Sequence, residues 1–281
     1  MVVLCFSLIA AAATAVFTVF SGAVTGVADI WKVLLFFIGA LVAVHILYLS
    51  YAALVSLSID KKKPLEKQSK NMKVLCEMAA SIVCTFLFIR PRVTGMEMLP
   101  ESGTFLLVCN HLSGYDPLVT IKLLRKYNVF FVMKPAILRL PLIGISTYGA
   151  GCIAIDRENN REALKSILQA ADYLKKGICS ICIYPEGTRS KTGALGEFHP
   201  GSFKVAQKAC TPIAVACIEG TEKVNRNILR RFTDVTMSIL EVIPAEQVAE
   251  MRTVDLAEHS RDLILKHQGM STGEKTGKEN E

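Results

Sequence analysis

The sequence predicts an α/β fold, a largely parallel sheet flanked by helices, preceded by an N-terminal transmembrane helical hairpin and an interfacial helix. Two observations carry this prediction. Residues 2–28 and 33–59 contain no charged side chain, and from residue 91 onward short apolar runs alternate with longer amphipathic runs. Strands that alternate with helices form parallel sheets covered on both faces.

The two uncharged runs predict membrane spans, because each exceeds the roughly 20 apolar residues that cross a hydrocarbon core. Only "DIWK" (29–32) separates them, which is enough for a tight turn. The first run lacks a basic n-region and is followed at once by the second, so we expect an uncleaved span rather than a signal peptide. A very apolar core hairpin of a soluble protein is the competing interpretation. Residues 1–60 are therefore assigned to a transmembrane hairpin.

A basic segment follows the second span. Residues 60–73 hold six lysines and two acids. Since basic residues flank the cytoplasmic ends of spans, we expect an integral cell-membrane protein with both termini and the catalytic domain on the cytoplasmic side. The same lysines can bind anionic headgroups of the lipid bilayer. No aromatic residues interleave with them, which argues against nucleic acid as a partner.

Residues 71–90 are apolar but contain Lys73 and Glu77, and Arg92 follows them. This pattern predicts a helix that lies in the membrane interface or dips into one leaflet, and a third full span is the second alternative. Residues 61–90 are thus expected to form a basic collar and an interfacial helix.

The α/β domain is expected over residues 91–267. The predicted strands are 104–110, 129–133, 151–156, 178–185, 212–220 and 232–243. The predicted helices are 116–127, 159–177, 201–210 and 253–267, with a broken helical segment at 134–150. Asp116 and Pro117 are typical of the N-cap and first position of a helix. The polar tail 268–281 is expected to be disordered.

The nine cysteines lie mostly in apolar runs, which favours buried, reduced thiols. Cys179 and Cys182 form a CxxC inside a predicted buried strand. No second CxxC or HxxxH spacing exists to complete a zinc site, so no metal is predicted.

Polar clusters follow three of the predicted strands: "NHLSGYD" (110–116), "DRENN" (156–160) and "YPEGTRS" (184–190). In open α/β sheets, ligands bind at the carboxyl ends of strands. The coincidence of three clusters at such positions is stronger evidence for a site than any one of them.

His111 and Asp116 lie in the first cluster. A plain helix cap is the alternative role for Asp116, because Asp before Pro is a common cap. One carboxylate oxygen could instead accept from the imidazole while the other faces the helix amides. An imidazole held in this way presents its outer nitrogen as a general base. No GxSxG motif is present to supply a serine nucleophile.

Three cations, Lys134, Arg157 and Arg189, follow predicted strands. A guanidinium fork matches phosphate oxygens, and Gly187 lets the backbone approach a ligand closely. Together they predict a site for a group with two or three negative charges. Singly, each is more often a solvated residue or an ion-pair partner. Glu186 could orient Arg189 rather than contact substrate.

These clusters resemble the sequence blocks of the glycerophospholipid acyltransferases. "NHLSGYD" is similar to the family's NHx(S)xxD block, and "GCIAIDR", "YPEGTRS" and "TPIAVACI" follow in the order and spacing of the next three blocks. The resemblance covers about residues 80–220. Within the family, the chain is most similar to the bacterial-type 1-acyl-sn-glycerol-3-phosphate acyltransferases.

The resemblance implies transfer of a fatty acyl group to the sn-2 hydroxyl of lysophosphatidic acid, giving phosphatidic acid. His111 would be the general base, supported by Asp116. The residues that would hold the substrate are Lys134, Arg157, Glu186, Gly187, Thr188 and Arg189. No resident cofactor is implied, and the co-substrate would be a thioester of coenzyme A or acyl carrier protein. The alternatives are another acceptor (glycerol-3-phosphate, dihydroxyacetone phosphate or a lysophospholipid) and a non-catalytic membrane lipid-binding protein.

Three positions depart from the family pattern. Ala136 stands where an acid is frequent, Ala154 where an aromatic residue is frequent, and Val215 where a second proline is frequent. None of them removes the proposed base or phosphate donors. The last two bear on the acyl pocket and therefore on chain-length preference.

Overall fold

The computed structural model describes residues 2–22, 26, 29–57, 59–60, 63–156, 159–190, 193–228 and 230–278. Two compact units make up the chain, Met1–Asp60 and Lys61–Glu281.

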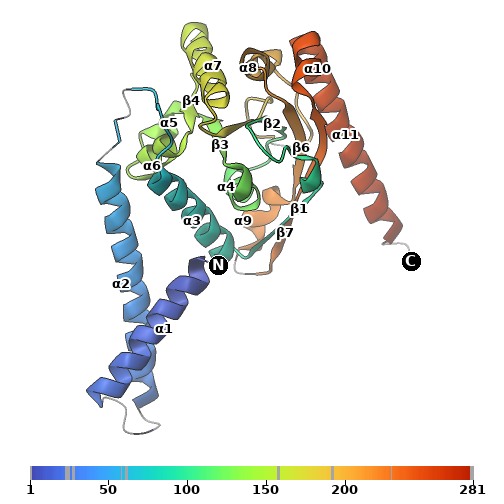
Figure 1. Cartoon of the computed structure of the whole chain (residues 1–281). Helices are drawn as coiled ribbons and strands as arrows, with labels where there is room; N and C mark the ends of the chain where they lie inside the picture. The colour runs from blue at the N-terminus through green and yellow to red at the C-terminus, as the bar shows by residue number, and fades with distance from the viewer. Residues whose placement is uncertain are drawn as a thin grey trace. The chain divides into compact units, whose positions relative to one another are not determined.

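The first unit is a helical hairpin of α1 (Val2–Ser21) and α2 (Ile30–Ser56) (Figure 1). Both helices are long and apolar enough to cross a membrane. Phe17 stacks on Phe36 with ring centroids 3.8 Å apart, and Phe6 meets His45 edge-on. Most of the large apolar side chains of the hairpin are exposed, as contact with lipid would require. The two predicted apolar helices are therefore confirmed.

The second unit contains a seven-stranded sheet in the order β1-β7-β6-β2-β5-β3-β4. All neighbouring strands are parallel except β6 and β7. This confirms the predicted α/β fold with a largely parallel sheet. The strands are β1 (Ile89–Thr94), β2 (Leu106–Cys109), β3 (Val129–Met133), β4 (Ile153–Ala154), β5 (Ser180–Ile183), β6 (Ile213–Glu219) and β7 (Thr233–Ile243).

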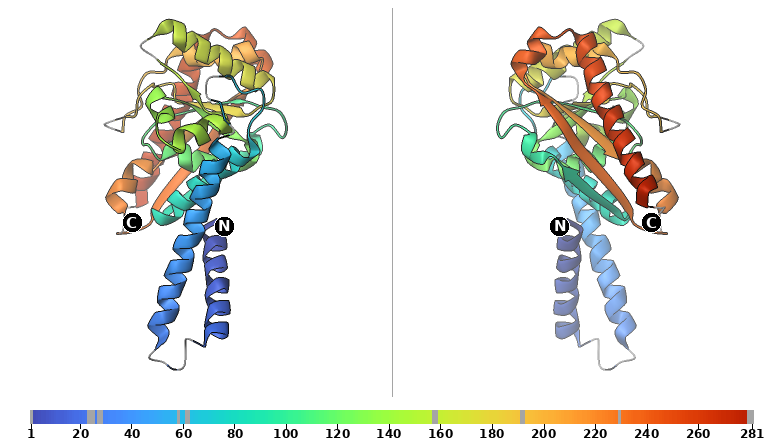
Figure 2. Two further views of the ribbon diagram at one scale, coloured as in Figure 1. Left: turned by 90° about the vertical axis from the view of Figure 1, so that its left-hand side faces the viewer. Right: turned by 90° about the vertical axis from the view of Figure 1, so that its right-hand side faces the viewer.

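Helices cover both faces of this sheet (Figures 1 and 2). One face carries α3 (Lys70–Phe86) and α4 (Asp116–Leu123). The other carries α7 (Asn160–Lys175), α8 (Lys204–Ala209) and α11 (Thr253–Lys278), and α11 lies along β6 and β7. The shorter helices are α5 (Pro135–Leu138), α6 (Ile143–Ala150), α9 (Val224–Asn227) and α10 (Ala245–Glu250), with 3-10 turns at Met96–Met98, Arg125–Tyr127, Pro200–Phe203 and Thr221–Lys223.

The central strands β2, β3 and β5 are buried at every residue. Helices on both faces exclude water from them, which is why they appear in the sequence as continuous apolar runs. In the register of the sheet, Val108 of β2 lies opposite Ile183 of β5 and Val215 of β6. The carboxyl ends of these three strands therefore meet at one edge of the sheet.

The predicted helix 71–90 is shorter than expected, and a strand was missed. α3 ends at Phe86, and β1 begins at Ile89 and pairs in parallel with β7. Phe88 adopts a left-handed φ of 53°, which ends the helix. Pro91 could not have continued it, since proline lacks the amide that a helix interior needs.

One face of α3 is buried through Met72, Leu75 and Cys76, where the helix packs on α4 and α6. The collar before it is also attached to the sheet unit. The amide of Leu65 donates to the hydroxyl of Tyr173 at 3.1 Å, and the amide of Ser69 donates to the carbonyl of Gly149 at 3.0 Å. The segment after residue 62 and α3 therefore belong to the same compact unit as the sheet.

The last helix is longer than predicted. α11 continues through Lys278, whereas the polar composition predicted a disordered tail from residue 268. Adding residues to an existing helix costs far less than nucleating one, so a polar sequence can follow α11 in helical form. Residues 279–281 lie outside the described part.

Candidate active site

His111 and Asp116 form a hydrogen-bonded pair beyond the carboxyl end of β2. Nδ1 of His111 lies 2.7 Å from Oδ2 of Asp116, which is completely buried, while the His111 side chain remains 18% exposed. An ionised carboxylate only accepts hydrogen bonds, so Nδ1 carries the proton and Nε2 is the basic nitrogen. Among the described residues, no hydrogen bond reaches Nε2. The pair can therefore accept a proton from a ligand.

The carboxylate of Asp116 has several further donors. Oδ2 accepts from the amides of Leu112 at 2.7 Å and Ser113 at 2.9 Å. Oδ1 accepts from the hydroxyl of Thr221 at 2.5 Å and from that of Ser113 at 3.4 Å. These contacts fix the carboxylate beneath the imidazole, as a general base requires.

The predicted capping role of Asp116 is wrong. The helix begins at Asp116 itself, Tyr115 occupies the N-cap position, and no side chain caps the helix amides. The carboxylate turns back toward the preceding loop, where the amides of Leu112 and Ser113 and the imidazole are within reach. Asp116 therefore supports His111 and orders the loop before α4.

Two residues of this network were not predicted. One is Thr221 and the other is Asn110. The buried side chain of Asn110 donates to the carbonyl of Ile218 at 2.9 Å and accepts from its amide at 2.7 Å. Both lie just after the carboxyl end of an apolar strand, Asn110 after β2 and Thr221 after β6. A polar residue at the end of an apolar run is the pattern that identified the other clusters, and it could have identified these two. Gly220, with φ of 95°, turns the chain so that Thr221 reaches Asp116.

Glu186 holds the backbone of His111. Its Oε1 accepts from the amide of His111 at 2.7 Å, and its Oε2 accepts from the amide of Gly196 at 2.9 Å. The amide of Ser190 in turn donates to the carbonyl of His111 at 2.9 Å. In the described part of the chain, Glu186 thus engages backbone amides rather than Arg189, and it fixes the backbone of His111.

The loop after β5 turns at Gly187, which has φ of 76° and donates to the carbonyl of Tyr184 at 3.1 Å. Glycine adopts this left-handed conformation without steric cost. Thr188 and Arg189 are exposed. A Cβ atom added to Gly114 would lie 3.9 Å from Nη1 of Arg189, so the guanidinium lies over the loop between His111 and Asp116.

Of the other two predicted cations, only Lys134 lies in the described part of the chain, farther along the same edge. Lys134 is exposed at the carboxyl end of β3, the neighbour of β5. Arg157 follows β4 but falls outside the described residues. Among the residues that the structure describes, neither Lys134 nor Arg189 has an ion-pair partner. The edge therefore offers positive charge that acidic side chains leave unpaired.

The imidazole of His111 packs against an aromatic ring. Its ring stacks on that of Tyr184 with centroids 4.2 Å apart, and burial raises the pKa of Tyr184 well above its usual range. Burial also raises the pKa of the Cys109 and Cys182 thiols. As predicted, Cys109 faces the core, and a protonated buried thiol is a poor nucleophile.

An apolar cavity of about 500 Å³ opens beside Tyr184. Side chains from β3, β5 and α7 line it, with the turn Pro200–Phe203 at its border. The apolar lining includes Val132, Ile155, Leu164, Ile167 and Ile183. Such a cavity can hold a hydrocarbon chain next to the imidazole.

Comparison with protein families matches residues 90–219 to the acyltransferase family model. The matched range contains His111, Asp116 and the Glu186–Ser190 loop.

Several characterised proteins are similar in sequence. The chain is 32% identical to the 1-acyl-sn-glycerol-3-phosphate acyltransferase of Salmonella typhimurium over 58% of this chain and 66% of that protein. It is also 32% identical to the chloroplastic 1-acyl-sn-glycerol-3-phosphate acyltransferase BAT2 of Brassica napus, over 50% of this chain and 41% of that protein. The matches thus span between about two fifths and just under two thirds of these relatives.

A solved structure shares the fold. The crystal structure of the 1-acyl-sn-glycerophosphate acyltransferase PlsC from Thermotoga maritima superimposes with a TM-score of 0.62 at 20% identity. The alignment covers 80% of this chain and 89% of that chain.

Proposed function

Residues 90–219 form a domain of the acyltransferase family, as the sequence blocks predicted, and on this basis we propose that the chain is a membrane-bound acyltransferase. It transfers a fatty acyl group from a thioester to the sn-2 hydroxyl of lysophosphatidic acid, giving phosphatidic acid. The observation that carries this proposal is the hydrogen bond from Nδ1 of His111 to the buried Asp116, which leaves Nε2 without a hydrogen bond to any described residue. The names of the similar proteins support the choice of acceptor.

His111 acts as the general base. Nε2 takes the proton of the hydroxyl as its oxygen attacks the thioester carbonyl, and Asp116 compensates the charge of the imidazolium. The carbon–sulfur bond then breaks, and the imidazolium returns the proton to the leaving thiolate. General-base assistance of this kind contributes about 10²–10⁴ in rate.

The phosphate of the acceptor binds to the cations at the same edge. Arg189 supports this assignment, because its guanidinium lies over the His111 loop without an ion-pair partner in the described residues. Gly187 and Thr188 carry the backbone close to the ligand, and Lys134 adds positive charge from the end of the neighbouring strand β3. Arg157 is assigned to the same group from the sequence alone. A dianionic phosphate matches this set better than a neutral alcohol.

The fatty acyl chain occupies the apolar cavity beside Tyr184. That position brings the thioester carbonyl close to the imidazole stacked on the same ring. The apolar hairpin anchors the protein to the bilayer. Each methylene that leaves the bilayer costs about 0.8 kcal/mol, so an enzyme that lifts only the reactive head from the leaflet avoids most of that cost.

The test is an acceptor and donor matrix with the full-length protein in detergent or lipid. Lysophosphatidic acid, glycerol-3-phosphate, dihydroxyacetone phosphate and a neutral-headgroup lysophospholipid are each combined with acyl-CoA or acyl carrier protein, and the products are identified by mass. We expect phosphatidic acid from lysophosphatidic acid. Faster turnover of another acceptor would move the assignment to that acceptor.

His111→Ala is the decisive variant in the same assay, and His259→Ala on α11 is its matched control. We expect His111→Ala to lose transfer while retaining native circular dichroism, and His259→Ala to keep it. Near-normal turnover by His111→Ala would refute its role as base. Lipid binding without turnover by the native protein would favour the non-catalytic alternative.

A further inference from the structure

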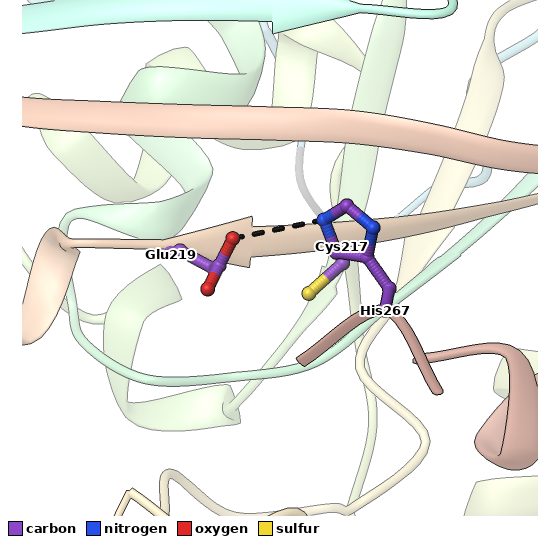
Figure 3. A group of neighbouring side chains, drawn as sticks. All are labelled: Cys217, Glu219 and His267. Carbon is purple, nitrogen blue, oxygen red and sulfur yellow. Dashed lines mark ion pairs between the residues drawn. The ribbon is translucent and has the colours of Figure 1, made fainter. Parts of the chain in front are cut away.

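A thiol, a carboxylate and an imidazole meet where α11 crosses the end of β6 (Figure 3). Cys217 and Glu219 are two residues apart in β6, so their side chains share one face of the strand. His267 reaches that face from α11, which packs on β6. One donor atom from each residue lies within 4.8 Å of the other two. This cluster lies outside the machinery proposed for acyl transfer.

The spacing of the cluster suits a bound ion better than a direct ion pair. Nε2 of His267 and Oε2 of Glu219 are 3.7 Å apart, too far for a good hydrogen bond. Zinc bonds of 2.0–2.3 Å in a tetrahedron place neighbouring ligand atoms roughly 3.5 Å apart. Since the donor atoms lie within 4.8 Å of one another, they need to close by about 1.3 Å at most to bind one ion.

A second pair in the same part of the fold provides a comparison. His259 of α11 and Glu241 of β7 lie 3.0 Å apart, at ordinary hydrogen-bond distance, and no cysteine accompanies them in the described structure. The wider separation thus occurs at the pair that also has a thiol beside it.

The cluster is buried at its thiol and partly exposed at its imidazole and carboxylate. Cys217 is 1% exposed, whereas the side chains of His267 and Glu219 keep 31% and 27% exposure. An ion can enter past the imidazole and the carboxylate, and water can complete a fourth position. Sulfur, nitrogen and oxygen donors together are typical of zinc, and calcium or magnesium would prefer oxygen alone.

We propose that Cys217, Glu219 and His267 bind Zn²⁺, with water as the fourth ligand, and that the ion fastens α11 to the end of β6. The sequence spacing predicted no metal because the third ligand is distant in the chain.

The site adjoins the catalytic network without being part of it. Ile218, between two of the ligands, makes two backbone hydrogen bonds with the side chain of Asn110, and Thr221 donates to Asp116. Zinc at this position would stiffen the strand end that holds the carboxylate.

The experiment uses tag-free, full-length protein that has been stripped with a chelator. Zn²⁺ is titrated by calorimetry, and Co²⁺ serves as a spectroscopic substitute. We expect one ion per chain and a thiolate-to-cobalt charge-transfer band. Cys217→Ala and His267→Gln should each weaken Zn²⁺ binding by at least about 10–100-fold, a loss that even an outer-shell substitution can cause. The matched controls His259→Gln and Cys210→Ser should bind as the native protein does.

Equal binding by Cys217→Ala and the native protein, or a cobalt spectrum without the thiolate band, would overturn the site. If Cys217→Ala does not fold, His267→Gln, which changes a partly exposed side chain, tests whether the cluster binds Zn²⁺. Amide hydrogen exchange tests separately whether the ion holds α11 against the end of β6. Zn²⁺ should slow exchange in α11 of the native protein and leave it unchanged in His267→Gln, and unaltered exchange in both would contradict the proposed role of the ion. None of these readouts requires acyl transfer, so their outcome is independent of the proposed function.

Discussion

Two regions of the site differ in how firmly the protein holds them. The base network (His111, Asp116, Asn110, Thr221 and Glu186) lies in and around buried strand ends, and each of its members hydrogen-bonds another part of the chain. The cation rim (Lys134, Thr188 and Arg189, with Arg157 outside the described residues) is exposed, and its described cations have no ion-pair partner. The chain thus fixes the geometry around the proposed base in advance and leaves the charged rim open to the proposed ligand.

The largest effect is expected from Asp116→Asn. The amide nitrogen cannot accept the donors that now reach the carboxylate, and it no longer holds Nδ1 of His111 protonated. We expect kcat to fall by about 10²–10⁴, the range of general-base assistance. The unfolding free energy should fall by about 1–3 kcal/mol, because buried donors lose their partner.

Steady-state kinetics and urea unfolding measure the two effects of Asp116→Asn. Asp255→Asn, an exposed aspartate on α11, is the control and should change neither kcat nor stability appreciably. A variant that retained most of its turnover would show that the base network is not needed for proton transfer.

Arg189→Ala tests the rim. Loss of charge-assisted hydrogen bonds worth about 1.5–3 kcal/mol should lower kcat/KM for lysophosphatidic acid by about 10–100-fold. Stability should be unchanged, since the side chain is exposed. Arg252→Ala, at the exposed residue just before α11, controls for the loss of one positive charge. Equal kcat/KM in the two variants would remove Arg189 from the phosphate site.

Thr221→Val is expected to have a smaller effect on catalysis, about tenfold on kcat with KM for the acceptor unchanged. The substitution preserves shape and removes only the hydroxyl that donates to Oδ1 of Asp116. Thr94→Val is the matched control, because it removes a threonine hydrogen bond to Ser238 outside the site. A change in KM without a change in kcat would contradict a positioning role for Thr221.

Alkaline pH should lower the free energy of unfolding slightly, through the buried thiols near the base network. Burial raises the pKa of the Cys109 and Cys182 thiols above their usual 9.0, so the folded state retains protons that the unfolded chain releases. The stability that these thiols contribute is complete below pH 9.0 and declines above it. Each should cost about 1 kcal/mol at pH 10. From pH 8 to 10, the urea midpoint of Cys182→Ala should fall less steeply than that of the native protein. The midpoint of Cys210→Ala, which changes an exposed thiol, should fall as steeply as that of the native protein.

The sequence predicted the central strands well because both of their faces are covered. β3 has the predicted bounds, and β2 and β5 lie within their predicted segments. β1 was missed because its exposed Arg90 and Arg92 alternate with partly buried residues at a sheet edge, directly after an apolar helix. Partial burial leaves no continuous apolar run to recognise.

The site was predictable where its contacts are local. His111 and Asp116 are five residues apart, so their pairing could be inferred from spacing. Thr221 is 105 residues from Asp116, and Ile218 is 108 residues from Asn110. Contacts over such separations depend on strand order, which no local pattern encodes. For the same reason Glu186 was assigned to substrate or Arg189 rather than to the backbone of His111.

The position of β2 between β5 and β6 has a consequence for synthesis of the chain. The apolar hairpin leaves the ribosome before the sheet unit, but the carboxylate of Asp116 gains the hydroxyl donor of Thr221 only after that residue has been translated. Until β6 has been made, the nascent polypeptide displays apolar β2 without one of its two neighbours, a state prone to aggregation. An mRNA truncated before the codons of β6 would therefore yield an inactive, aggregation-prone fragment rather than an enzyme of reduced activity.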